Sequence, residues 1–340
     1  MIKGYTTFLV TGGGGYLGSV LVPMLLSEGY KVVVIDRFFW GKNVFGDLKN
    51  NSNLKLLEKD TRTLDKKDME GIDVVIDLAS LSNDPTGEIN PKNTMEINYK
   101  TRVRTAKIAK SVGVKKYILA SSCSVYGFRD TILNEKSKVA PITTYAKASA
   151  LAEIDTLKLS DNRFSVTVLR QGTLYGTSPR MRFDLVLNTM VLSYFKDKRI
   201  SVLGGGQWRP LLNVRDSARA FILVAKTSDA KVNGEIFNVG DNKQNYQIKK
   251  LASLIAHKLS NNTNIAIQNA QDDFRSYRVS FEKIKKVLGY KTKENPTNIS
   301  KTIYISLKNG DLKFTKKTQT LEWYKHLLSK DPKILERKTT

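Results

Sequence analysis

A run of glycines near the N-terminus has the spacing of a phosphate-binding turn. The segment 12–18 reads GGGGYLG, so Gly12, Gly15 and Gly18 stand three residues apart, with Tyr16 and Leu17 between the last two. Glycines at this spacing allow a tight turn, close approach of the backbone to a diphosphate, and close packing of a helix on a strand. The amides at the start of the following helix would then hold the diphosphate of a dinucleotide.

A carboxylate follows this turn at the distance typical of a dinucleotide site. Asp36 comes 18 residues after Gly18, at the end of an apolar run. A carboxylate there accepts hydrogen bonds from the adenosine ribose hydroxyls and repels a 2′-phosphate, which favours NAD over NADP. The neighbouring Arg37 acts against this preference, because an arginine could meet the 2′-phosphate. We therefore expect NAD, with NADP as the alternative.

Hydroxyl side chains stand in two segments further along the chain, and their role follows only from the family resemblance described below. Ser122 lies in a serine-rich segment, SSCSVYG at 121–127, and Tyr145 lies at the start of a helical stretch. A phenolate can take the proton of a hydroxyl group while a nicotinamide takes the hydride. Cys123 has no histidine near it in the sequence, so we interpret it as a small buried residue.

Alternating strands and helices are expected to position these residues. The pattern predicts a Rossmann-type doubly wound parallel sheet with helices on both faces, followed by a smaller mixed α/β C-terminal substrate domain. The predicted strands are 7–11, 31–35, 54–57, 74–78, 117–120, 166–169 and 200–203, and the predicted helices are 16–27, 93–112, 145–159, 184–196, 216–226 and 248–259.

We expect three regions along the chain. Residues 1–175 form the NAD-binding domain, and residues 176–315 form the substrate-binding region. No Pro/Gly/Ser linker divides them, so the second should pack directly on the first. The tail 316–340 is lysine-rich around Trp323 and Tyr324 and predicts a surface helix that frays at its end.

From about Phe8 to Tyr290 the chain resembles the extended short-chain dehydrogenase/reductases that act on nucleotide-sugars, the group of NAD-dependent epimerases and dehydratases. Besides the glycine turn, the resemblance rests on the segment DTR at 60–62, the segment DLAS at 77–80 and an asparagine in the next helix. It implies that these segments contact the cofactor through Asp60, Thr61, Leu78, Ala79, Ser80 and Asn98.

The resemblance also assigns the reacting centre. It implies that Ser122 hydrogen-bonds the sugar oxygen being oxidised and that Tyr145 is the base. Hydride transfer would take place at a sugar carbon, and C4 is the carbon we expect. The family has a lysine four residues after the tyrosine, where this chain has Ser149. Lys147 is two residues on, about 200° around a helix, and should point away from the cofactor. Efficient proton transfer is therefore in doubt, and the active site is atypical.

Dehydration is disfavoured by the residues after Ser122. The 4,6-dehydratases carry acidic groups there, whereas this chain has Cys123 and Ser124. We expect an epimerase or dehydrogenase, whose product is a 4-keto sugar, an epimer or a reduced ketone.

The substrate side depends on the resemblance as well. It implies that Arg209 and Arg275 bind the nucleotide diphosphate, since a guanidinium can donate two bonds to phosphate oxygens. Ser82 and Asn83 are expected in a loop over the sugar, and Asn188 is a further predicted substrate-binding residue. The segment SPRMR at 178–182 resembles that of a GDP-heptose 4-dehydrogenase, but it does not identify the sugar or the base.

The chain has 340 residues and a formal net charge of +24. A basic surface attracts nucleic acid, but the lysines are scattered and no arginine-rich block or RNA-binding motif is present, so we disfavour a nucleic-acid partner. The alternative function is a catalytically weak dinucleotide-binding protein with a structural or RNA-associated role, which the serine at position 149 and the charge favour.

Other features of the sequence bear on the cellular compartment, membrane association and oligomeric state of the protein. A single cysteine fits a reducing compartment, no apolar run is long enough to span a bilayer, and the first residues leave no room for a signal peptide. We expect a cytoplasmic protein with no metal site. Family members commonly dimerise through two helices of each subunit, so the helices at 93–112 and 145–159 are expected to form a homodimer.

Overall fold

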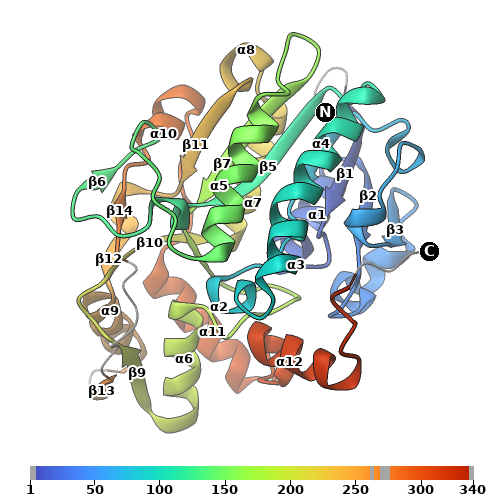
Figure 1. Ribbon diagram of the computed structural model, residues 1–340. Coiled ribbons are helices and arrows are strands. Elements are labelled where there is room, and N and C mark those ends of the chain that lie inside the picture. Colours follow the sequence, from blue (N-terminus) through green and yellow to red (C-terminus); the bar gives the residue numbers. More distant parts are fainter. Residues whose placement is uncertain (1–4, 261–263, 269–275, 337–340) are drawn as a thin grey trace.

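A parallel sheet of seven strands lies at the centre of the molecule in the computed structural model, which describes residues 5–260, 264–268 and 276–336 (Figure 1). The strand order is β11-β7-β5-β4-β1-β2-β3, and every neighbouring pair is parallel. This confirms the predicted Rossmann-type sheet. Its strands are β1 (Thr7–Thr11), β2 (Lys31–Asp36), β3 (Leu54–Glu58), β4 (Val74–Asp77), β5 (Lys116–Ser122), β7 (Ser165–Gln171) and β11 (Glu235–Val239).

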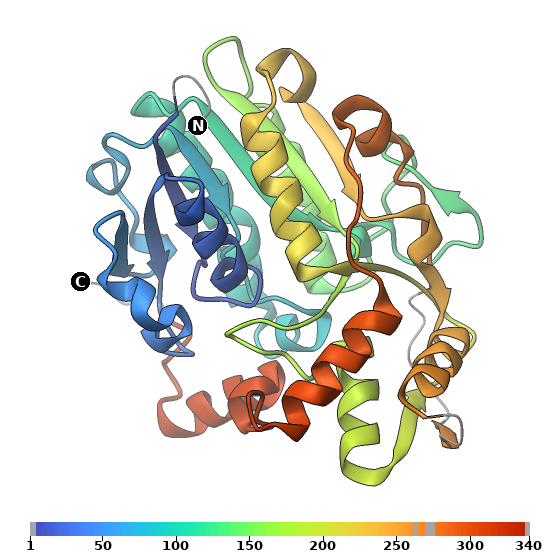
Figure 2. The ribbon, with the colours of Figure 1, turned by 180° about the vertical axis from the view of Figure 1, so that it is seen from behind.

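Helices cover both faces of this sheet, as its apolar strands require. The residues of β4, VVID, are all buried, because a parallel strand inside such a sheet has no solvent side. On one face lie α4 (Arg102–Ser111) and α5 (Thr144–Leu157), and on the other lie α1 (Gly18–Ser27) and α7 (Val214–Lys226), as the two opposite views show (Figures 1 and 2).

The helix predicted over residues 93–112 is interrupted. It begins as α3 (Pro91–Met95), continues through a π-helical turn at Glu96–Thr101, and only then becomes α4. The predicted helical stretch is confirmed, and residues 96–101 within it form the π turn. A π turn inserts an extra residue per turn and is often found beside a functional site.

Outside the central sheet, the described part of the chain builds three small sheets and further helices, most of them after residue 175. The sheets are β12-β10-β8, β13-β9 and β14-β6. This confirms the smaller mixed region. The strands are β6 (Ile132–Leu133), β8 (Thr173–Tyr175), β9 (Arg199–Leu203), β10 (Trp208–Asn213), β12 (Asn245–Gln247), β13 (Asn264–Gln268) and β14 (Arg278–Val279). The helices are α2 (Asp84–Gly87), α6 (Val186–Asp197), α8 (Asp229–Val232), α9 (Ile248–Leu259), α10 (Glu282–Leu288), α11 (Pro296–Lys308) and α12 (Thr320–Lys330), and short 3₁₀ turns occur at 42–50, 61–63, 67–69, 123–126, 242–244 and 316–318.

The chain crosses back to the central sheet after leaving it. Both α7 and β11 follow residue 175, yet β11 pairs with β7 and α7 packs on the sheet. Residue 175 therefore does not separate two layers of the structure. The predicted domain boundary at this residue stays a prediction.

The C-terminal tail is more than a surface helix. Tyr324 in α12 is only 4% exposed and packs edge-on against Trp40, with 5.3 Å between ring centroids. The Trp323 indole donates to the carbonyl of Phe39 (2.9 Å), and Arg62 donates to that of Leu335 (3.0 Å). The expectation of a surface helix was therefore incomplete, because one apolar side of α12 packs over the loop that follows β2.

Among the described residues, none of the helices combines the length and the apolar character that a membrane span requires.

Candidate functional site

A cavity of about 670 Å³ opens beyond the carboxyl ends of the central strands, where parallel sheets of this kind bind ligands. It extends from the glycine turn to the start of α5 and is bordered by α12. Most of the residues predicted from the sequence line it together, namely Gly12, Gly15, Tyr16, Leu17, Gly18, Asp36, Arg37, Asp60, Thr61, Leu78, Ala79, Ser80, Ser82, Asn83, Ser122, Tyr145 and Arg209.

The glycine turn needs its glycines for two different reasons. Gly12 has φ +68°, and a Cβ there would lie 2.7 Å from the backbone nitrogen of Ala79, so any side chain would fill the space beside β4. A Cβ on Gly18 would lie 2.5 Å from the Cα of Gly13, so this glycine allows α1 to pack against the turn. The result is an open cradle at the N-terminus of α1, where the positive potential at the start of a helix favours an anion.

The carboxylate of Asp36 is held by the turn itself. It accepts hydrogen bonds from the amides of Gly14 (3.0 Å) and Phe38 (2.7 Å). Burial raises the pKa of Asp36, and these amides oppose the rise. The side chain is thus oriented at the end of β2, where it faces the cavity.

Arg37 is engaged by a carboxylate of the protein. Its Nη1 lies 3.4 Å from Asp60 Oδ2, and its guanidinium lies 4.6 Å from the ring centroid of Phe39. Asp60 also accepts bonds from Arg62 Nη2 (2.7 Å) and Nε (3.1 Å). Burial acts to raise the pKa of Asp60, but its bonds with Arg62 hold that pKa below its usual value. With its charge paired in this way, Arg37 is less suited to a 2′-phosphate.

Ser122 and Tyr145 meet at the inner part of the cavity. Ser122 is the last residue of β5, and Tyr145 lies in the first turn of α5, where Thr143 caps the helix by accepting from the amide of Ala146 (3.2 Å). Burial raises the pKa of the Tyr145 phenol and the Asp84 carboxylate adds to the rise, whereas Arg102, hydrogen bonding by Ser122, and Arg182 act to lower it.

The residues around this pair agree with two expectations, for Lys147 and Cys123, and show one further contact, made by Ser149. Lys147 is exposed and does not line the cavity. Ser149 is buried, and its hydroxyl donates to the carbonyl of Tyr145 at 2.9 Å. Cys123 is fully buried, and this burial raises the pKa of its thiol. No ammonium therefore stands one helical turn after Tyr145.

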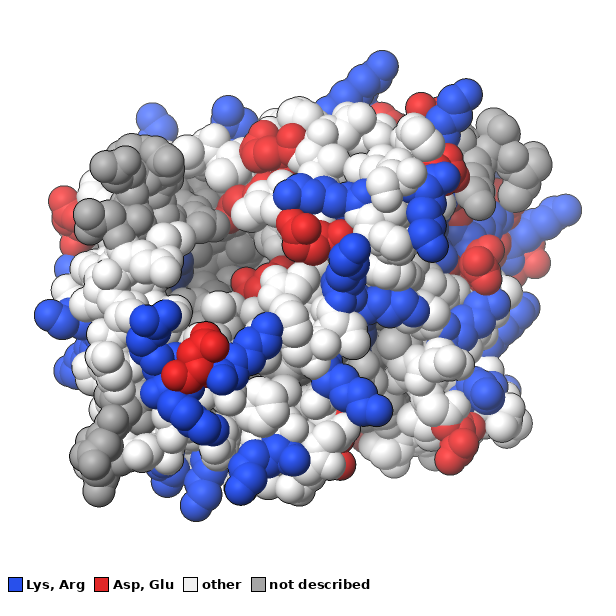
Figure 3. Space-filling view, turned by 90° about the horizontal axis from the view of Figure 1, so that it is seen from below, with Lys and Arg blue, Asp and Glu red and all other residues white. Residues whose placement is uncertain are grey.

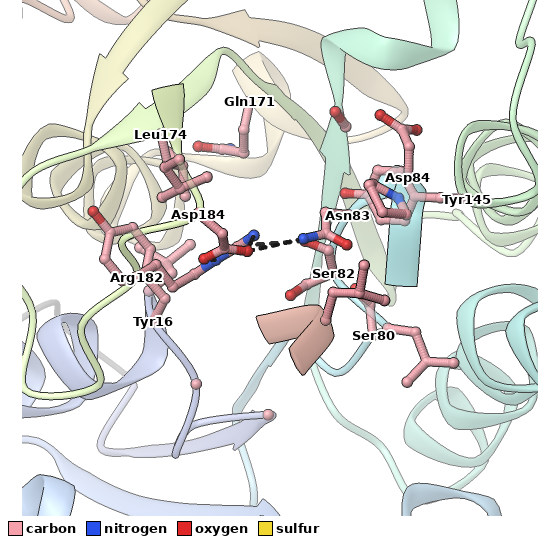
Figure 4. A pocket seen from close by; sticks show the side chains of 18 of the residues that line it. Tyr16, Ser80, Ser82, Asn83, Asp84, Tyr145, Gln171, Leu174, Arg182 and Asp184 are labelled. Carbon is pink, nitrogen blue, oxygen red and sulfur yellow. Dashed lines mark hydrogen bonds and ion pairs between the residues drawn. The ribbon is translucent and has the colours of Figure 1, made fainter. Parts of the chain in front are cut away.

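A polar bridge crosses the cavity between the two halves of the chain. Arg182 forms a fork with Asp184, with 2.8 Å between Nη2 and Oδ2, and donates through Nη1 to the carbonyl of Ser82 (3.1 Å). The Asn83 amide donates to the same Asp184 oxygen at 3.0 Å, as the close view shows (Figure 4). The bridge joins the loop after β4 to the loop after β8.

Arg180 is a site residue that the sequence analysis did not identify. It lines the cavity and is 4% exposed, and its guanidinium lies 3.9 Å from the ring centroid of Trp40. Its Nη2 donates to the Thr320 hydroxyl (3.0 Å), but Nε and Nη1 are buried without a partner among the described residues. Burial, together with the charge of Arg182, lowers the pKa of Arg180 to about 9.

Two predicted residues lie outside the cavity. The Asn98 amide accepts from the backbone nitrogen of Leu81 (2.8 Å) and donates to its carbonyl (3.1 Å). The Asn188 amide accepts from the backbone nitrogen of Gly176 (3.0 Å) and donates to the carbonyl of Arg182 (2.8 Å). In this structure both hold loops that border the cavity, and neither is among its lining residues.

Two arginines were predicted to bind the nucleotide diphosphate, and the structure describes one of them. Arg209 lines the cavity, is 8% exposed and lies 5.8 Å from the ring centroid of Tyr277. Arg275 lies outside the described residues.

Comparisons with known proteins agree on one family. The family model described as "NAD dependent epimerase/dehydratase family" matches residues 8–240. UDP-glucuronic acid decarboxylase 1 of Xenopus tropicalis is 26% identical over 294 residues, which are 83% of this chain and 67% of the relative. UDP-glucuronate 4-epimerase of Thermodesulfobacterium geofontis is 26% identical over 264 residues, 73% of this chain and 79% of the relative.

The solved structures support the same fold. The UDP-glucuronic acid 4-epimerase of Bacillus cereus, in complex with UDP-glucuronic acid and NAD, aligns with a TM-score of 0.78 at 22% identity. The alignment covers 89% of this chain and 99% of that protein.

Proposed function

Because the chain belongs to the NAD-dependent epimerase/dehydratase family, we propose that it oxidises a sugar carbon of a nucleotide-diphosphate sugar, with NAD as the hydride acceptor. C4 is the carbon we propose. The observation that carries the proposal is that Ser122 and Tyr145 line the same cavity as the glycine turn and Asp36. Relatives are named for UDP-linked sugars, so a UDP-sugar is the first substrate to test.

The residues present fit a dinucleotide. The cradle at Gly12 and the N-terminus of α1 would hold the diphosphate, together with the two unpaired nitrogens of Arg180. Asp36 would hold the adenosine ribose, and the pairing of Arg37 with Asp60 favours NAD over NADP. When bound, NAD supplies a nicotinamide that accepts hydride.

The protein's own side chains would handle the proton. Tyr145, as phenolate, takes the proton of the sugar hydroxyl, and Ser122 holds the same oxygen by a hydrogen bond. The bridge of Asn83, Asp184 and Arg182 lies between these groups and the second half of the chain, where it can orient the sugar and keep water out.

The nucleotide end of the substrate belongs to the second half of the chain. We propose that Arg209 and Arg275 bind the diphosphate, and that Ser82 and Asn83 contact the sugar. Arg209 supports this by its position, since it lines the cavity on β10, away from the glycine turn.

The net reaction we propose is epimerisation or oxidation. Elimination of water needs an acid beside the reacting carbon, and the residues after Ser122 do not provide one. Cys123 is fully buried with a raised pKa, and Ser124 carries an ordinary hydroxyl.

The test is spectroscopic and kinetic. Purified protein loaded with NAD is mixed with UDP-glucuronic acid, UDP-glucose or GDP-linked sugars, and absorbance at the NADH band and the sugar products are followed. We expect at least one sugar to be converted. Tyr145→Phe should lower turnover by about 10²- to 10⁴-fold and leave NAD binding nearly intact. Phenylalanine fills the same space as tyrosine but has no hydroxyl group to transfer a proton.

A matched control is Tyr304→Phe, which removes a hydroxyl that bonds only with Lys198 in the described structure. It should leave turnover unchanged. Equal rates for the wild type and Tyr145→Phe, or no reaction with any nucleotide-sugar, would contradict the proposal.

A further inference from the structure

The pair of Arg182 and Asp184 is tied to Tyr145 through the short helix α2. Asn83, whose amide donates to Asp184 at 3.0 Å, is also the N-cap of α2. This helix packs directly on the tyrosine, since a Cβ added to Gly87 would lie 3.1 Å from the Cβ of Tyr145. The pair lines the same cavity as the tyrosine (Figure 4). It therefore borders the space that the proposed function gives to the sugar.

The protein engages every nitrogen of the Arg182 guanidinium. Nε donates to Asp184 Oδ1 (3.1 Å) and Nη2 donates to Oδ2 (2.8 Å), the two-bond geometry in which arginine binds a carboxylate. The remaining nitrogen, Nη1, donates to the carbonyl of Ser82 (3.1 Å). A carboxylate on a substrate would therefore find both edges of this guanidinium occupied.

Asp184 is held in place by more than its arginine. It accepts from the Asn83 amide, and the Thr320 hydroxyl of α12 bonds to it as well. The side chains of Arg182 and Asp184 are only 7% and 14% exposed. Separating a buried ion pair leaves a charge uncompensated, which is strongly unfavourable. We therefore expect Asp184 to stay on Arg182 when a substrate binds.

Three other arginines line the cavity near this pair, and each has a different partner or proposed role. Arg102 is paired with Asp77, whose Oδ1 lies 3.5 Å from its Nε. The amide of Arg180 lies 3.4 Å from the Ser19 hydroxyl of α1, and its unpaired nitrogens are proposed for the NAD diphosphate. Arg209 on β10 is proposed for the diphosphate of the substrate. None of the three is assigned to a charge on the sugar.

The place of the charge on a uronic acid follows from its covalent structure. Its carboxylate is C6, which is attached to C5, the neighbour of C4. If C4 lies at Ser122 and Tyr145, that carboxylate must lie beside them, close to Asp184. Two carboxylates would then share a space from which water is excluded, and the second would have no cation of its own. A hydroxymethyl group in the same place can instead donate to Asp184, because a carboxylate accepts several hydrogen bonds.

We propose that this site takes a neutral hexose on its nucleotide diphosphate and discriminates against the corresponding hexuronic acid, and that Asp184 sets this preference. The inference rests on the proposed function, oxidation of the sugar at C4. The relatives compared above are named for glucuronic acid or glucuronate, so the preference is not carried over from them. It follows from the side chains that line this cavity.

The test compares two substrates that differ only at C6. Protein loaded with NAD is given UDP-glucose or UDP-glucuronic acid, and kcat/KM is measured from the sugar products, with affinity measured by calorimetry. GDP-mannose and GDP-mannuronic acid provide the same comparison for a guanine nucleotide. We expect the neutral sugar to be preferred by about tenfold or more, since like charges placed together oppose binding.

Asp184→Asn removes the negative charge and keeps an oxygen for Arg182, whose charge is then available to a substrate. We expect the ratio of kcat/KM for the uronic acid to kcat/KM for the neutral sugar to rise about tenfold or more. A purely structural role of Asp184 would lower both values alike and leave the ratio unchanged. The matched control is Asp197→Asn, which changes an exposed carboxylate at the end of α6, outside the cavity, and should not alter the ratio.

The outcomes separate this inference from the proposed function. A wild-type protein that takes the uronic acid as readily as the neutral sugar would overturn the inference and leave the proposed function standing, as would a folded Asp184→Asn protein with an unchanged ratio. If Asp184→Asn does not fold, Arg182→Gln combined with Asp184→Asn leaves neither charge buried alone, and it should raise the ratio too. Conversion of no nucleotide-sugar would contradict the proposed function itself, and the inference with it.

Discussion

At residue 180 a guanidinium is buried with two of its three nitrogens unpaired, within the part of the chain that the structure describes. Leaving a charged donor unsatisfied costs stability, so such a side chain suggests a missing anionic partner. The amide of Arg180 lies 3.4 Å from the Ser19 hydroxyl in α1, so its backbone is near the cradle proposed for the NAD diphosphate.

Arg180→Met should therefore have opposite effects on the free and the loaded protein. Without NAD, its thermal midpoint should equal or exceed that of the wild type, because an unpaired buried charge is removed. The affinity for NAD, measured by calorimetry, should fall about tenfold to a hundredfold.

Arg180→Lys is the matched control and should retain most of the NAD affinity. A variant Arg180→Met that binds NAD as tightly as the wild type would show that the unpaired nitrogens do not face the diphosphate.

Residues with a local motif could be predicted from the sequence, and residues defined by burial could not. Gly12, Asp36 and Tyr145 belong to short motifs next to recognisable elements, and all three line the cavity. Arg180 lies in the segment 178–182 that resembles a GDP-heptose 4-dehydrogenase, but that resemblance gave this arginine no role. Its importance depends on the absence of solvent and on a partner far away in the chain, Thr320.

At the scale of elements, the tail differs most from expectation. The sequence predicts a helix there, but periodicity does not say which surface that helix covers. Tyr324 and Leu335 line the cavity together with Trp40, so α12 and the segment after it close one side of the space proposed for NAD. The same limit applies to the π turn before α4, which no local pattern indicated.

Tyr324→Ala should loosen this closure. It removes a buried ring that packs against Phe39 and Trp40, with centroids 5.8 and 5.3 Å away. We expect the dissociation rate of NAD to rise about tenfold or more, because α12 can move away from the cavity more easily. The rate is measured after dilution from the change in the tryptophan fluorescence of the protein. Lys325→Ala, on the exposed side of the same helix, should leave the rate unchanged. An unaltered rate in Tyr324→Ala would mean that α12 does not retain the cofactor.

At the scale of the whole molecule, the charge of +24 forms no single block on the face that Figure 3 shows. Lysine and arginine side chains there are spread among carboxylates, a distribution that differs from the continuous basic stripe of a nucleic-acid site. Positive potential over the surface would still attract an anionic nucleotide-sugar.

The face formed by α4 and α5 is the surface on which we expect a second copy of the chain. On α5, Leu151 and Ile154 are about one helical turn apart and are 37% and 49% exposed, so they form an exposed apolar pair on this helix. Two copies related by a two-fold axis would bring these pairs together, since the same patch meets itself in such a dimer. Dimerisation would bury them without obstructing the cavity, which opens at the strand ends.

Sedimentation should therefore give about twice the chain mass of 38.2 kDa for the wild type. Replacing both residues by aspartate places like charges opposite each other and should shift the mass to that of one chain, while NAD binding persists. Ile305→Asp changes an equally exposed apolar residue, 44% exposed, on α11, and should leave the dimer intact. A wild-type protein that sediments as a single chain would contradict the dimer. A dimer that tolerates both aspartates would show that the contact between the two copies lies elsewhere.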